Sequence, residues 1–398
     1  MIINSLFLKM NAYQYLKEIR YTFYTKKIPK KYFIVGNSTC DMDSALSAYL
    51  LSIGKNIRNK LVVIDDSNSV SINPDAGEIY LPVLNCPRGE FQSRLDGKFI
   101  FEKFHLNEED FFYIDDPELS EERFGKEGEK NYVILVDHSV LDVNQRYLAN
   151  HVVEVFDHHF TLKMDYPNLQ RKFIKYPCGS CTTLILVDYF LSKFPHSILS
   201  PLLAVSGILI DTENFKEEFK GNRWTELDRM IYNLIMGQIQ ANIDMDKYYK
   251  AIFDEKGNVE KNLNLGLKRI LEKDRKNFQW KDFIVEWSSL QISFNIVLKH
   301  FGIQSVIDYI NEKFKGKINY YVINSRIETK NKAFVIYSFD EFNGIDLEKM
   351  EAFLKEKFAE KLNGFTVDKE HSMVTIELDK TATRKIAEPV IKRFFINE

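Results

Sequence analysis

The stretch Val152-Val-Glu-Val-Phe-Asp157-His158-His159 ends an apolar run with one acidic residue and two histidines. A short run rich in valine predicts a buried strand, so the polar residues would lie at its carboxyl end. Adjacent histidines alone more often belong to a solvated loop. The preceding strand and aspartate instead favour a cation site, because carboxylate oxygens with a single nitrogen suit Mg²⁺ or Mn²⁺ better than structural zinc.

Short β-rich runs alternate with helical segments on both sides of this motif, between residues 31 and 211. Such alternation predicts an α/β domain with a parallel sheet covered by helices. Sites in such sheets lie at the carboxyl ends of the strands. We predict strands at Lys31–Gly36, Leu61–Ile64, Phe111–Ile114, Tyr132–Asp137 and Val152–Asp157, and helices at Ser44–Ile53, Glu90–Phe104 and Thr182–Phe194.

Further carboxylates follow other apolar runs. Asp41 and Asp43 stand two residues apart after the first predicted strand, so both can face one site, although turn formation and N-capping are the commoner roles of such residues. Asp137 ends one apolar run and Asp211 ends another, and we expect both at strand ends. A charge that closes a buried run must be solvated, paired or bound to metal. With Asp157, we therefore expect five carboxylates and one or two imidazoles at one sheet edge.

The chain of 398 residues is too long for one ordinary core, so two domains are expected. Residues 225–254 look helical and polar, and Asp254-Glu-Lys-Gly-Asn258 looks like a linker. We predict a first domain at 1–240, a linker at 241–262 and a smaller α/β domain with a mixed sheet at 263–398. Its predicted strands are Phe283–Trp287, Tyr320–Asn324, Ala333–Ser338 and Met373–Leu378, and its predicted helices are Leu263–Glu272, Ile303–Phe314, Leu347–Leu362 and a last one from Arg384.

Cys178-Gly-Ser-Cys181 precedes a predicted helix and is open to three interpretations. It could be a redox pair, since a helix N-terminus lowers a thiol pKa. It could be half of a zinc site, although no second pair lies near Cys40 or Cys86 in sequence. We favour a capped helix N-terminus, which can also take an anion.

Two basic clusters lie in the second domain. Lys268, Arg269, Lys273, Arg275 and Lys276 are expected around one helix, and Arg384 with Lys385 opens the last helix. A solvated helix face is the simplest explanation of both. Cations at a helix N-terminus nevertheless oppose the macrodipole, and a bound anion would resolve that conflict.

Composition narrows the functional classes. The net charge of −3 gives no overall attraction to nucleic acid or to anionic membranes, so we expect neither as a partner. The longest apolar runs fall far short of the ~20 residues needed to span a bilayer. We also expect no signal peptide, and a cytoplasmic location with reduced cysteines.

These motifs in their order resemble the DHH phosphoesterase superfamily, in particular its branch of cytosolic exopolyphosphatases and prune-like proteins. Asp157-His158-His159 matches the naming motif, Gly36-Asn37-Ser-Thr-Cys-Asp41-Met-Asp43-Ser44 the first motif, Val136-Asp137-His138 the second and Ile210-Asp211-Thr212 the fourth. The C-terminal half resembles the companion DHHA2 domain, with Lys273-Asp-Arg-Lys276-Asn-Phe and Ala382-Thr-Arg384-Lys385 as its basic motifs. The stretch Leu81–Arg94 and Tyr113-Ile-Asp115-Asp116 resemble this branch rather than family II pyrophosphatases.

The resemblance implies an active site in the cleft between the two domains, with two divalent cations, Mg²⁺ or alternatively Mn²⁺. Asp41 and Asp137 would hold one, with Asn37 weakly or through water. Asp43, Asp137, His158 and Asp211 would hold the other. His159 would contact the transferred phosphoryl group and assist proton transfer, and Lys276, Arg384 and Lys385 would bind substrate. Arg88 and Arg94 have either a substrate-binding or a structural role.

The implied activity is release of phosphate from the ends of inorganic polyphosphate. The alternatives are a prune-like short-chain polyphosphatase, a cyclic-nucleotide phosphodiesterase, an inorganic pyrophosphatase or, in another class, a metal-free scaffold. Asn37 stands where pyrophosphatases carry a metal-binding histidine. Loss of an imidazole should weaken the affinity for Mn²⁺ and Co²⁺ and favour Mg²⁺.

Overall fold

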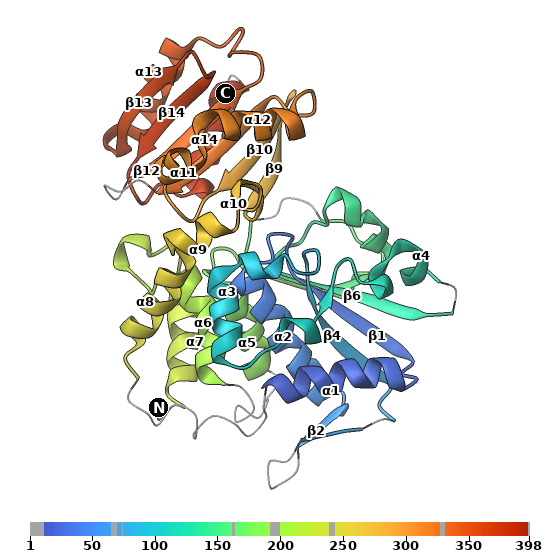
Figure 1. Ribbon diagram of the computed structural model, residues 1–398. Coiled ribbons are helices and arrows are strands. Elements are labelled where there is room, and N and C mark those ends of the chain that lie inside the picture. The colour runs from blue at the N-terminus through green and yellow to red at the C-terminus, as the bar shows by residue number, and fades with distance from the viewer. Residues whose placement is uncertain are drawn as a thin grey trace. The chain divides into compact units, whose positions relative to one another are not determined.

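The computed structural model describes residues 12–64, 70–73, 75–126, 128–160, 164–191, 200–238, 243–326 and 331–396. The chain divides into two compact units, Met1–Glu255 (unit 1) and Lys256–Glu398 (unit 2). Figure 1 shows both units, and each is described by itself. The segment expected to be a linker, residues 241–262, is largely helical where the structure describes it.

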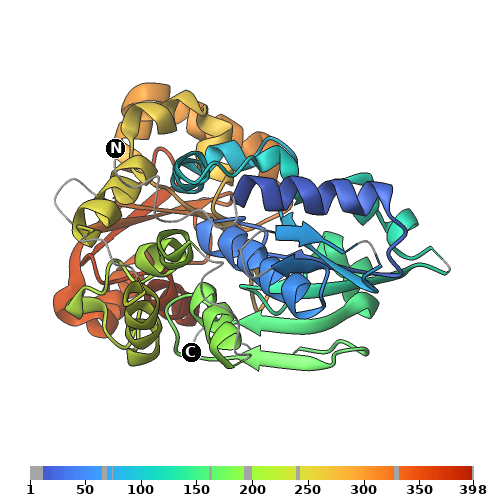
Figure 2. The same ribbon diagram turned by 90° about the horizontal axis from the view of Figure 1, so that it is seen from below.

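Unit 1 is built on a six-stranded parallel sheet with the strand order β5-β4-β1-β6-β7-β8. In Figure 2 its green strands lie alongside one another with their arrowheads at the same edge. The tyrosine rings of β4, β1 and β6 stack across one face, with Tyr32 4.4 Å from Tyr80 and 4.9 Å from Tyr132. The strands are β1 (Lys30–Val35), β4 (Glu78–Leu84), β5 (Phe112–Tyr113), β6 (Lys130–Val136), β7 (Val152–Asp157) and β8 (Arg171–Ile174).

The helix α2 (Met42–Arg58) is buried along nearly its whole length, because it lies against β4 and against the helices α5 and α6. The helices α5 (Cys181–Leu191) and α6 (Pro201–Asp211) are accordingly apolar on all sides. The other helices of unit 1 are α1 (Ala12–Thr25), α3 (Leu95–Lys103), α4 (Glu121–Phe124), α7 (Glu226–Met236) and α8 (Met245–Lys256), and 3₁₀ segments lie at Phe91–Ser93, Glu108–Asp110, Pro117–Leu119, Val143–His151 and Glu217–Phe219.

Unit 2 contains a mixed six-stranded sheet with the order β13-β14-β12-β11-β10-β9, in which only β10 and β11 pair in parallel. Side chains alternate between two cores, so Tyr320 and Val322 pack on one face and Tyr321 and Ile323 on the other. Its elements are α9 (Val259–Asn264), α10 (Leu267–Glu272), β9 (Arg275–Trp280), β10 (Phe283–Ser289), α11 (Phe294–Phe301), α12 (Ile303–Phe314), β11 (Tyr320–Arg326), β12 (Lys332–Ser338), α13 (Leu347–Phe358), a 3₁₀ segment (Ala359–Lys361), β13 (Leu362–Asp368), β14 (Met373–Leu378) and α14 (Arg384–Phe395).

The predicted fold class is confirmed: an α/β protein with a parallel N-terminal sheet and a mixed C-terminal sheet. Several details were wrong. The run Leu61–Ile64 contributes β2 (Val62–Ile64) to a separate hairpin with β3 (Val70–Ile72), not to the main sheet. The basic cluster expected around one helix is divided, because α10 ends at Glu272 and Lys276 lies in β9. The strands β3, β4, β8, β9 and β13 were not predicted.

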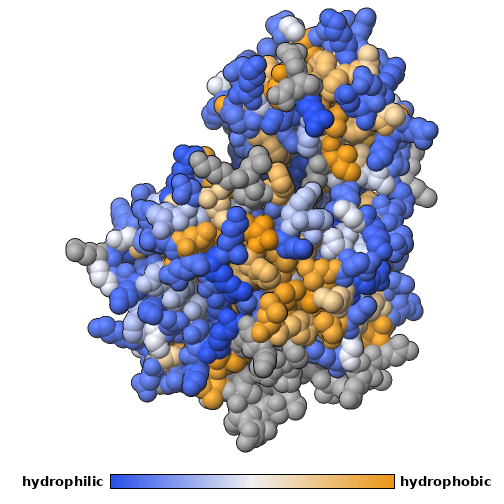
Figure 3. Space-filling view, turned by 180° about the vertical axis from the view of Figure 1, so that it is seen from behind, coloured by the Kyte–Doolittle hydropathy of each residue, from blue (hydrophilic) through white to orange (hydrophobic). Residues whose placement is uncertain are grey.

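Large apolar side chains are exposed at some places in the described part of the chain, among them Leu191, Met230 and Leu234 on α5 and α7. Figure 3 shows apolar areas within a mainly hydrophilic surface. No helix among the described residues has the length and apolar character needed to cross a membrane.

Candidate metal centre

The centre of the site is the meeting point of β1 and β6. From β1 the chain runs outward to β4 and β5, then returns to place β6 on the opposite side of β1. The carboxyl ends of β1 and β6 therefore flank the point where the strand order reverses, where sheets of this kind bind ligands. Asn37 follows β1 and Asp137 follows β6, and Nδ2 of Asn37 donates a hydrogen bond of 2.5 Å to Oδ2 of Asp137.

Asp137 is held firmly in this position. Oγ of Ser44, in the first turn of α2, donates a second hydrogen bond of 2.5 Å to Oδ2 of Asp137. The backbone of Asp137 has a φ of 62°, a left-handed conformation that aspartate tolerates better than most residues. Its Oδ1 is buried and has no hydrogen-bond partner in the described structure other than the ion-pair contacts with the two histidines.

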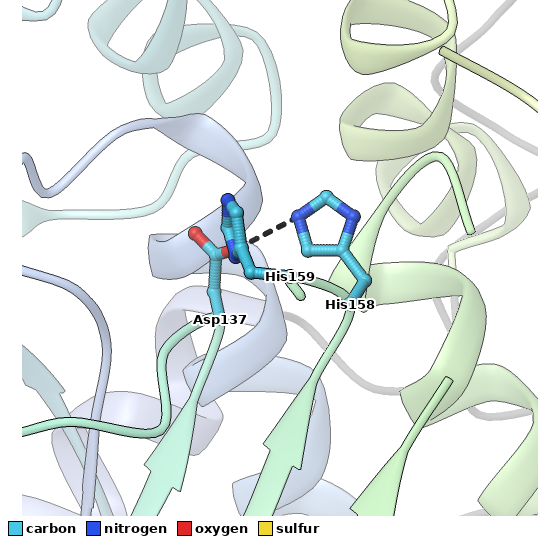
Figure 4. A group of neighbouring side chains, drawn as sticks. All are labelled: Asp137, His158 and His159. Carbon is cyan, nitrogen blue, oxygen red and sulfur yellow. Dashed lines mark ion pairs between the residues drawn. The ribbon is translucent and has the colours of Figure 1, made fainter. Parts of the chain in front are cut away.

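His158 directs one ring nitrogen at this oxygen. Nε2 of His158 lies 3.0 Å from Oδ1 of Asp137 (Figure 4), and Nδ1 lies 3.0 Å from the carbonyl oxygen of Cys178. A carbonyl can only accept, so Nδ1 carries a proton and donates it. Without a cation, the 3.0 Å contact of Nε2 with Oδ1 of Asp137 requires a proton between the two atoms. Once that proton is lost, Nε2 has the lone pair, which is the tautomer that a metal ligand needs.

His159 is paired with the aspartate that precedes it. Nδ1 of His159 lies 2.9 Å from Oδ1 of Asp157, and the backbone N–H of His159 donates to the same oxygen at 3.0 Å. Burial alone would raise the pKa of Asp157, but the hydrogen bonds and charge of His159 lower it to about 2. The side chain of His159 is 28% exposed, whereas that of His158 is 4% exposed. His159 is thus the imidazole that faces solvent.

Asp43 is bound by the N-terminus of α5. Its Oδ1 accepts hydrogen bonds from Oγ of Ser180 at 2.6 Å, from the backbone N–H of Thr182 at 2.9 Å and from its Oγ1 at 2.6 Å. Its Oδ2 accepts from the backbone N–H of Cys181 at 2.7 Å and lies 3.8 Å from Nε2 of His158. Burial would raise the pKa of Asp43, but His158 and these donors lower it. The ionised form is therefore favoured.

Two glycines permit this close approach. A Cβ on Gly36 would lie 2.9 Å from Cβ of Ser44, so any side chain there would displace the start of α2. A Cβ on Gly207 in α6 would lie 2.6 Å from Oγ1 of Thr182 and 3.2 Å from Oδ1 of Asp43. The contact of α2, α5 and α6 at the site depends on the absence of a side chain at Gly207.

Asp211 reaches the site from a helix and not from a strand. The run that ends at Asp211 forms α6, so the expected strand is wrong, and the carboxylate extends from the last residue of that helix. An apolar run of this length fits a buried helix as well as a buried strand, which explains the error. Ligand atoms of Asp43, His158 and Asp211 nevertheless lie within 4.8 Å of one another, as do those of Asp137, His158 and His159.

The crowding of carboxylates is unfavourable without a cation. Burial, followed by repulsion from Asp41, raises the pKa of Asp137 to about 7. Burial and the charges of Asp43 and Asp41 raise the pKa of Asp211 well above its ordinary value. Buried carboxylates that oppose one another's ionisation, beside an imidazole nitrogen oriented as a lone-pair donor, fit a site for hard divalent cations.

Asp41 has a capping role in this structure. Its Oδ1 accepts the backbone N–H of Ser44 at 3.0 Å, which makes Asp41 the N-cap of α2. It does not belong to either group of metal-ligand atoms found among the described residues. Its charge still acts on the pKa of Asp137 and of Asp211, so it lies in their electrostatic neighbourhood. Its predicted role as a ligand stays a prediction.

Three of the predicted substrate-binding residues, Lys276, Arg384 and Lys385, belong to unit 2, whereas His159 belongs to unit 1. Lys276 lies in β9, and Arg384 opens α14. Nη1 of Arg384 donates to Oδ1 of Asp274 at 3.2 Å and to Oγ of Ser289 at 3.0 Å, so an acidic residue already partly neutralises this cation. The side chain of Lys385 lies outside the described part of the structure. Binding of substrate across the two units stays a prediction.

The surroundings of the Cys178–Cys181 motif indicate a structural role. The helix α5 begins at Cys181, in line with the helix N-terminus interpretation, and the anion bound there is the carboxylate of Asp43. Burial raises the pKa of both thiols in the motif, which disfavours a redox role.

Arg88 donates to Asp116 and to Glu109, each at 2.7 Å, so its guanidinium is bound by carboxylates within unit 1.

Three supporting contacts were missed in the sequence. Ser44 donates to Asp137, the carbonyl of Cys178 orients His158, and Ser180 with Thr182 fixes Asp43. The serine and threonine residues beside Gly179 were visible as capping residues, but no signal in the sequence pairs them with a carboxylate more than a hundred residues earlier. The contact of His158 with the carbonyl of Cys178 could not be predicted from residue types, because every residue has a backbone carbonyl.

Comparison with known proteins agrees with this geometry. Residues 31–204 match the model of the DHH family, N-terminal domain, and this range contains every residue of the cluster except Asp211. Exopolyphosphatase PRUNE1 of Bos taurus is 24% identical over 283 residues, which cover 68% of this chain and 54% of that protein. The human protein of the same name is 25% identical over 280 residues, 67% of this chain and 53% of its own length. The chain thus spans about half the length of these curated relatives.

The fold has a counterpart among solved structures. A Methanococcus jannaschii protein assigned as a family II inorganic pyrophosphatase superposes with a TM-score of 0.60 and 18% identity, covering 92% of this chain and 99% of that one. At this identity the likeness concerns the fold alone.

Proposed function

We propose that the chain, whose residues 31–204 match the DHH family model, is a phosphoesterase of that family and an exopolyphosphatase that hydrolyses terminal phosphoanhydride bonds of inorganic polyphosphate and releases orthophosphate. The observation that carries the proposal is the convergence of Asp43, Asp137, His158 and Asp211 at the carboxyl edge of the parallel sheet. Relatives that bear the name exopolyphosphatase support the choice of substrate.

We assign the ligands as the sequence motifs imply. Asp41 and Asp137 would hold one divalent cation, and Asp43, Asp137, His158 and Asp211 the other, with Asp137 shared. Two such cations supply a water of lowered pKa and neutralise the oxygens of an in-line displacement. Mg²⁺ is the expected ion, because oxygen ligands dominate the set. Asn37 serves by orienting Asp137, since its amide donates to Oδ2 and leaves Oδ1 for a ligand bond.

We assign to His159 the transfer of a proton to the phosphoryl group. Its Nδ1 is bound to Asp157, which fixes the ring, and we assign the contact with the substrate to Nε2. Because Asp157 stays ionised at neutral pH, it stabilises a protonated His159, and that form can donate to a phosphoryl oxygen. The partial exposure of His159 allows contact with a substrate that arrives from solvent.

Unit 2 would supply the cations that bind the rest of the polyanion. Arg384 uses Nη1 for Asp274 and Ser289, and its other N–H groups can bind phosphate in a bidentate manner. Lys276 and Lys385 would add charge. With the metal ligands in unit 1 and these cations in unit 2, substrate binding would favour a closed arrangement of the two units.

The test is a substrate panel. Phosphate release is measured with Mg²⁺ from long-chain polyphosphate, tripolyphosphate, pyrophosphate and a cyclic nucleotide, for wild type and Asp137→Asn. The proposal expects turnover of polyphosphate, little on pyrophosphate and loss of more than about a hundredfold in the variant, since even outer-sphere ligand partners are worth 10- to 100-fold. Activity on only the short or nucleotide substrates would instead assign a prune-like phosphatase, phosphodiesterase or pyrophosphatase. No activity with any divalent cation would support a scaffold.

A further inference from the structure

Asp228 is a fully buried carboxylate outside the cluster of ligands. It stands in the first turn of α7 and accepts the backbone N–H of Thr225 at 2.8 Å and its Oγ1 at 2.9 Å, which closes a capping box. A capping box needs only one carboxylate oxygen. Both oxygens of Asp228 also accept the backbone N–H of Gly179, at 3.0 and 2.9 Å, and Oδ1 accepts Oγ1 of Thr183 at 2.7 Å.

The segment that Asp228 holds is the turn that orients the site. Sγ of Cys178 donates to Oδ1 of Asp228 at 3.3 Å, while the carbonyl of the same cysteine accepts Nδ1 of His158. Two residues further, Ser180 donates to Asp43. Asp228 thus fixes Cys178 and Gly179. The carbonyl of Cys178 sets the tautomer of His158, and Ser180, the neighbour of Gly179, helps to set the position of Asp43.

The turn has little freedom to adopt another position. A Cβ on Gly179 would lie 2.6 Å from the carbonyl oxygen of Arg223 and 3.1 Å from Cγ of Asp228, so the backbone of the turn lies directly on the start of α7. Because the turn is closely packed there, a displacement of the Asp228 side chain should also displace Cys178. The groups that donate hydrogen bonds to Asp228 are neutral amides, hydroxyls and a thiol. They fix the orientation of the carboxylate through hydrogen-bond geometry and not through an opposite charge.

We propose that Asp228 is a positioning residue of the metal centre, which anchors the Cys178–Ser180 turn so that His158 presents Nε2 and Asp43 presents its carboxylate to the cation. The inference rests on the proposed function, because it concerns the same cluster. It extends the site to α7 (Glu226–Met236), which follows Asp211 in the chain after an intervening segment.

The variant Asp228→Asn tests the proposal. Both oxygens accept from a backbone N–H that cannot rotate away, so an NH₂ group at either position meets a donor and displaces the turn. Two readouts are measured. In the metal-free protein, ¹⁵N NMR of the histidine rings reports the tautomer of His158, and isothermal titration with Mn²⁺ reports the dissociation constant. We expect loss of the Nδ1-protonated tautomer and Mn²⁺ binding weakened about 10- to 100-fold, the range for residues that orient ligands.

Four further variants separate positioning from stability. Thr225→Ala weakens the capping box but leaves the contacts with Gly179, so it should lower the melting temperature without changing the tautomer or the Mn²⁺ affinity. Asp346→Asn, at the N-cap of α13 in unit 2, is the matched control for loss of a capping carboxylate. If Asp228→Asn does not fold, Thr183→Val removes one donor at constant volume, and Thr183→Ser should restore the affinity.

Each outcome decides one point. A folded Asp228→Asn with the wild-type tautomer and Mn²⁺ affinity, or equal affinities for Thr183→Val and Thr183→Ser, would refute the positioning role. Wild-type protein that shows the expected tautomer but binds no Mn²⁺ would refute the proposed function and leave the anchoring of His158 supported.

Discussion

At the residue scale, the account depends most on Asp137. Its side chain combines a buried position, two hydrogen bonds to one oxygen and a second oxygen directed at His158. The sequence predicted its presence at the site, because a charge that closes an apolar strand needs a partner. It did not predict that Asn37 and Ser44 would supply those hydrogen bonds, since contacts between strands far apart in sequence follow from topology.

The raised pKa of Asp137 gives a prediction about stability without metal. Because the folded pKa of about 7 lies above the ordinary value of 3.8, the native state binds more protons than the unfolded state between these values. Stability contributed by this group is therefore lost as pH rises from about 4 to 7. Urea unfolding with a chelator should show that the stability of wild type relative to Asp137→Asn falls from pH 5 to pH 8. A difference independent of pH would contradict the assignment.

Asn37 gives a second prediction at this scale. Its amide donates to Asp137 and accepts from Thr39, so we expect it to bind a cation more weakly than an imidazole nitrogen would. The variant Asn37→His should increase the preference for Mn²⁺ over Mg²⁺ by about tenfold or less, as expected when one nitrogen ligand joins an oxygen set. Phosphate release at limiting concentrations of each metal measures it. A wild-type enzyme in which Mn²⁺ already dominates would contradict the interpretation.

At the element scale, the site is made by the meeting of α2, α5 and α6 at the end of the sheet. The sequence predicted β1, β6 and β7 because their runs are short and mainly apolar, but it assigned the run before Asp211 to a strand. A short apolar run fits a buried helix as well as a buried strand, so its periodicity does not distinguish the two. The left-handed conformations of Glu213, Asn214 and Phe215, directly after α6, were equally beyond prediction, since no glycine marks them.

Gly207 allows the contact of these helices to be tested. Gly207→Ala places a methyl group within 2.6 Å of Oγ1 of Thr182 and should cost about 1–3 kcal/mol of stability, as overpacking does. The displacement of Thr182 should also weaken Mn²⁺ binding, because Thr182 holds Asp43. Chemical denaturation and titration calorimetry measure both. The control is Gly77→Ala, which meets no atom within 4 Å; an equal effect of the two changes would argue against a specific contact.

At the scale of the whole molecule, two units with separate cores divide the proposed work between metal binding and substrate binding. The division was predictable in outline from chain length and from the polar helical stretch before residue 256. The strands β9 and β13 were not, because half-exposed sequences such as Arg275–Trp280 alternate weakly and carry charges.

Arg384 tests the assignment of substrate binding to unit 2. If it binds the polyanion equally in the ground and transition states, Arg384→Ala should raise KM for polyphosphate by about tenfold or more and change kcat much less. Arg384→Lys should recover part of the loss, because it keeps the charge but not the bidentate geometry. The exposed Arg393, in the last turn of α14, provides the control Arg393→Ala. A fall in kcat alone would show that Arg384 acts in the transition state.

The central claim is that the carboxyl edge of the parallel sheet holds two divalent cations that share Asp137. Titration of the metal-free protein with Mn²⁺, followed by calorimetry and electron paramagnetic resonance, tests it most directly. The account predicts two ions per chain with a spin-coupled signal, and in Asp137→Asn weakened binding and loss of the coupling. A single uncoupled ion in wild type, or a coupled pair that persists in the variant, would contradict it.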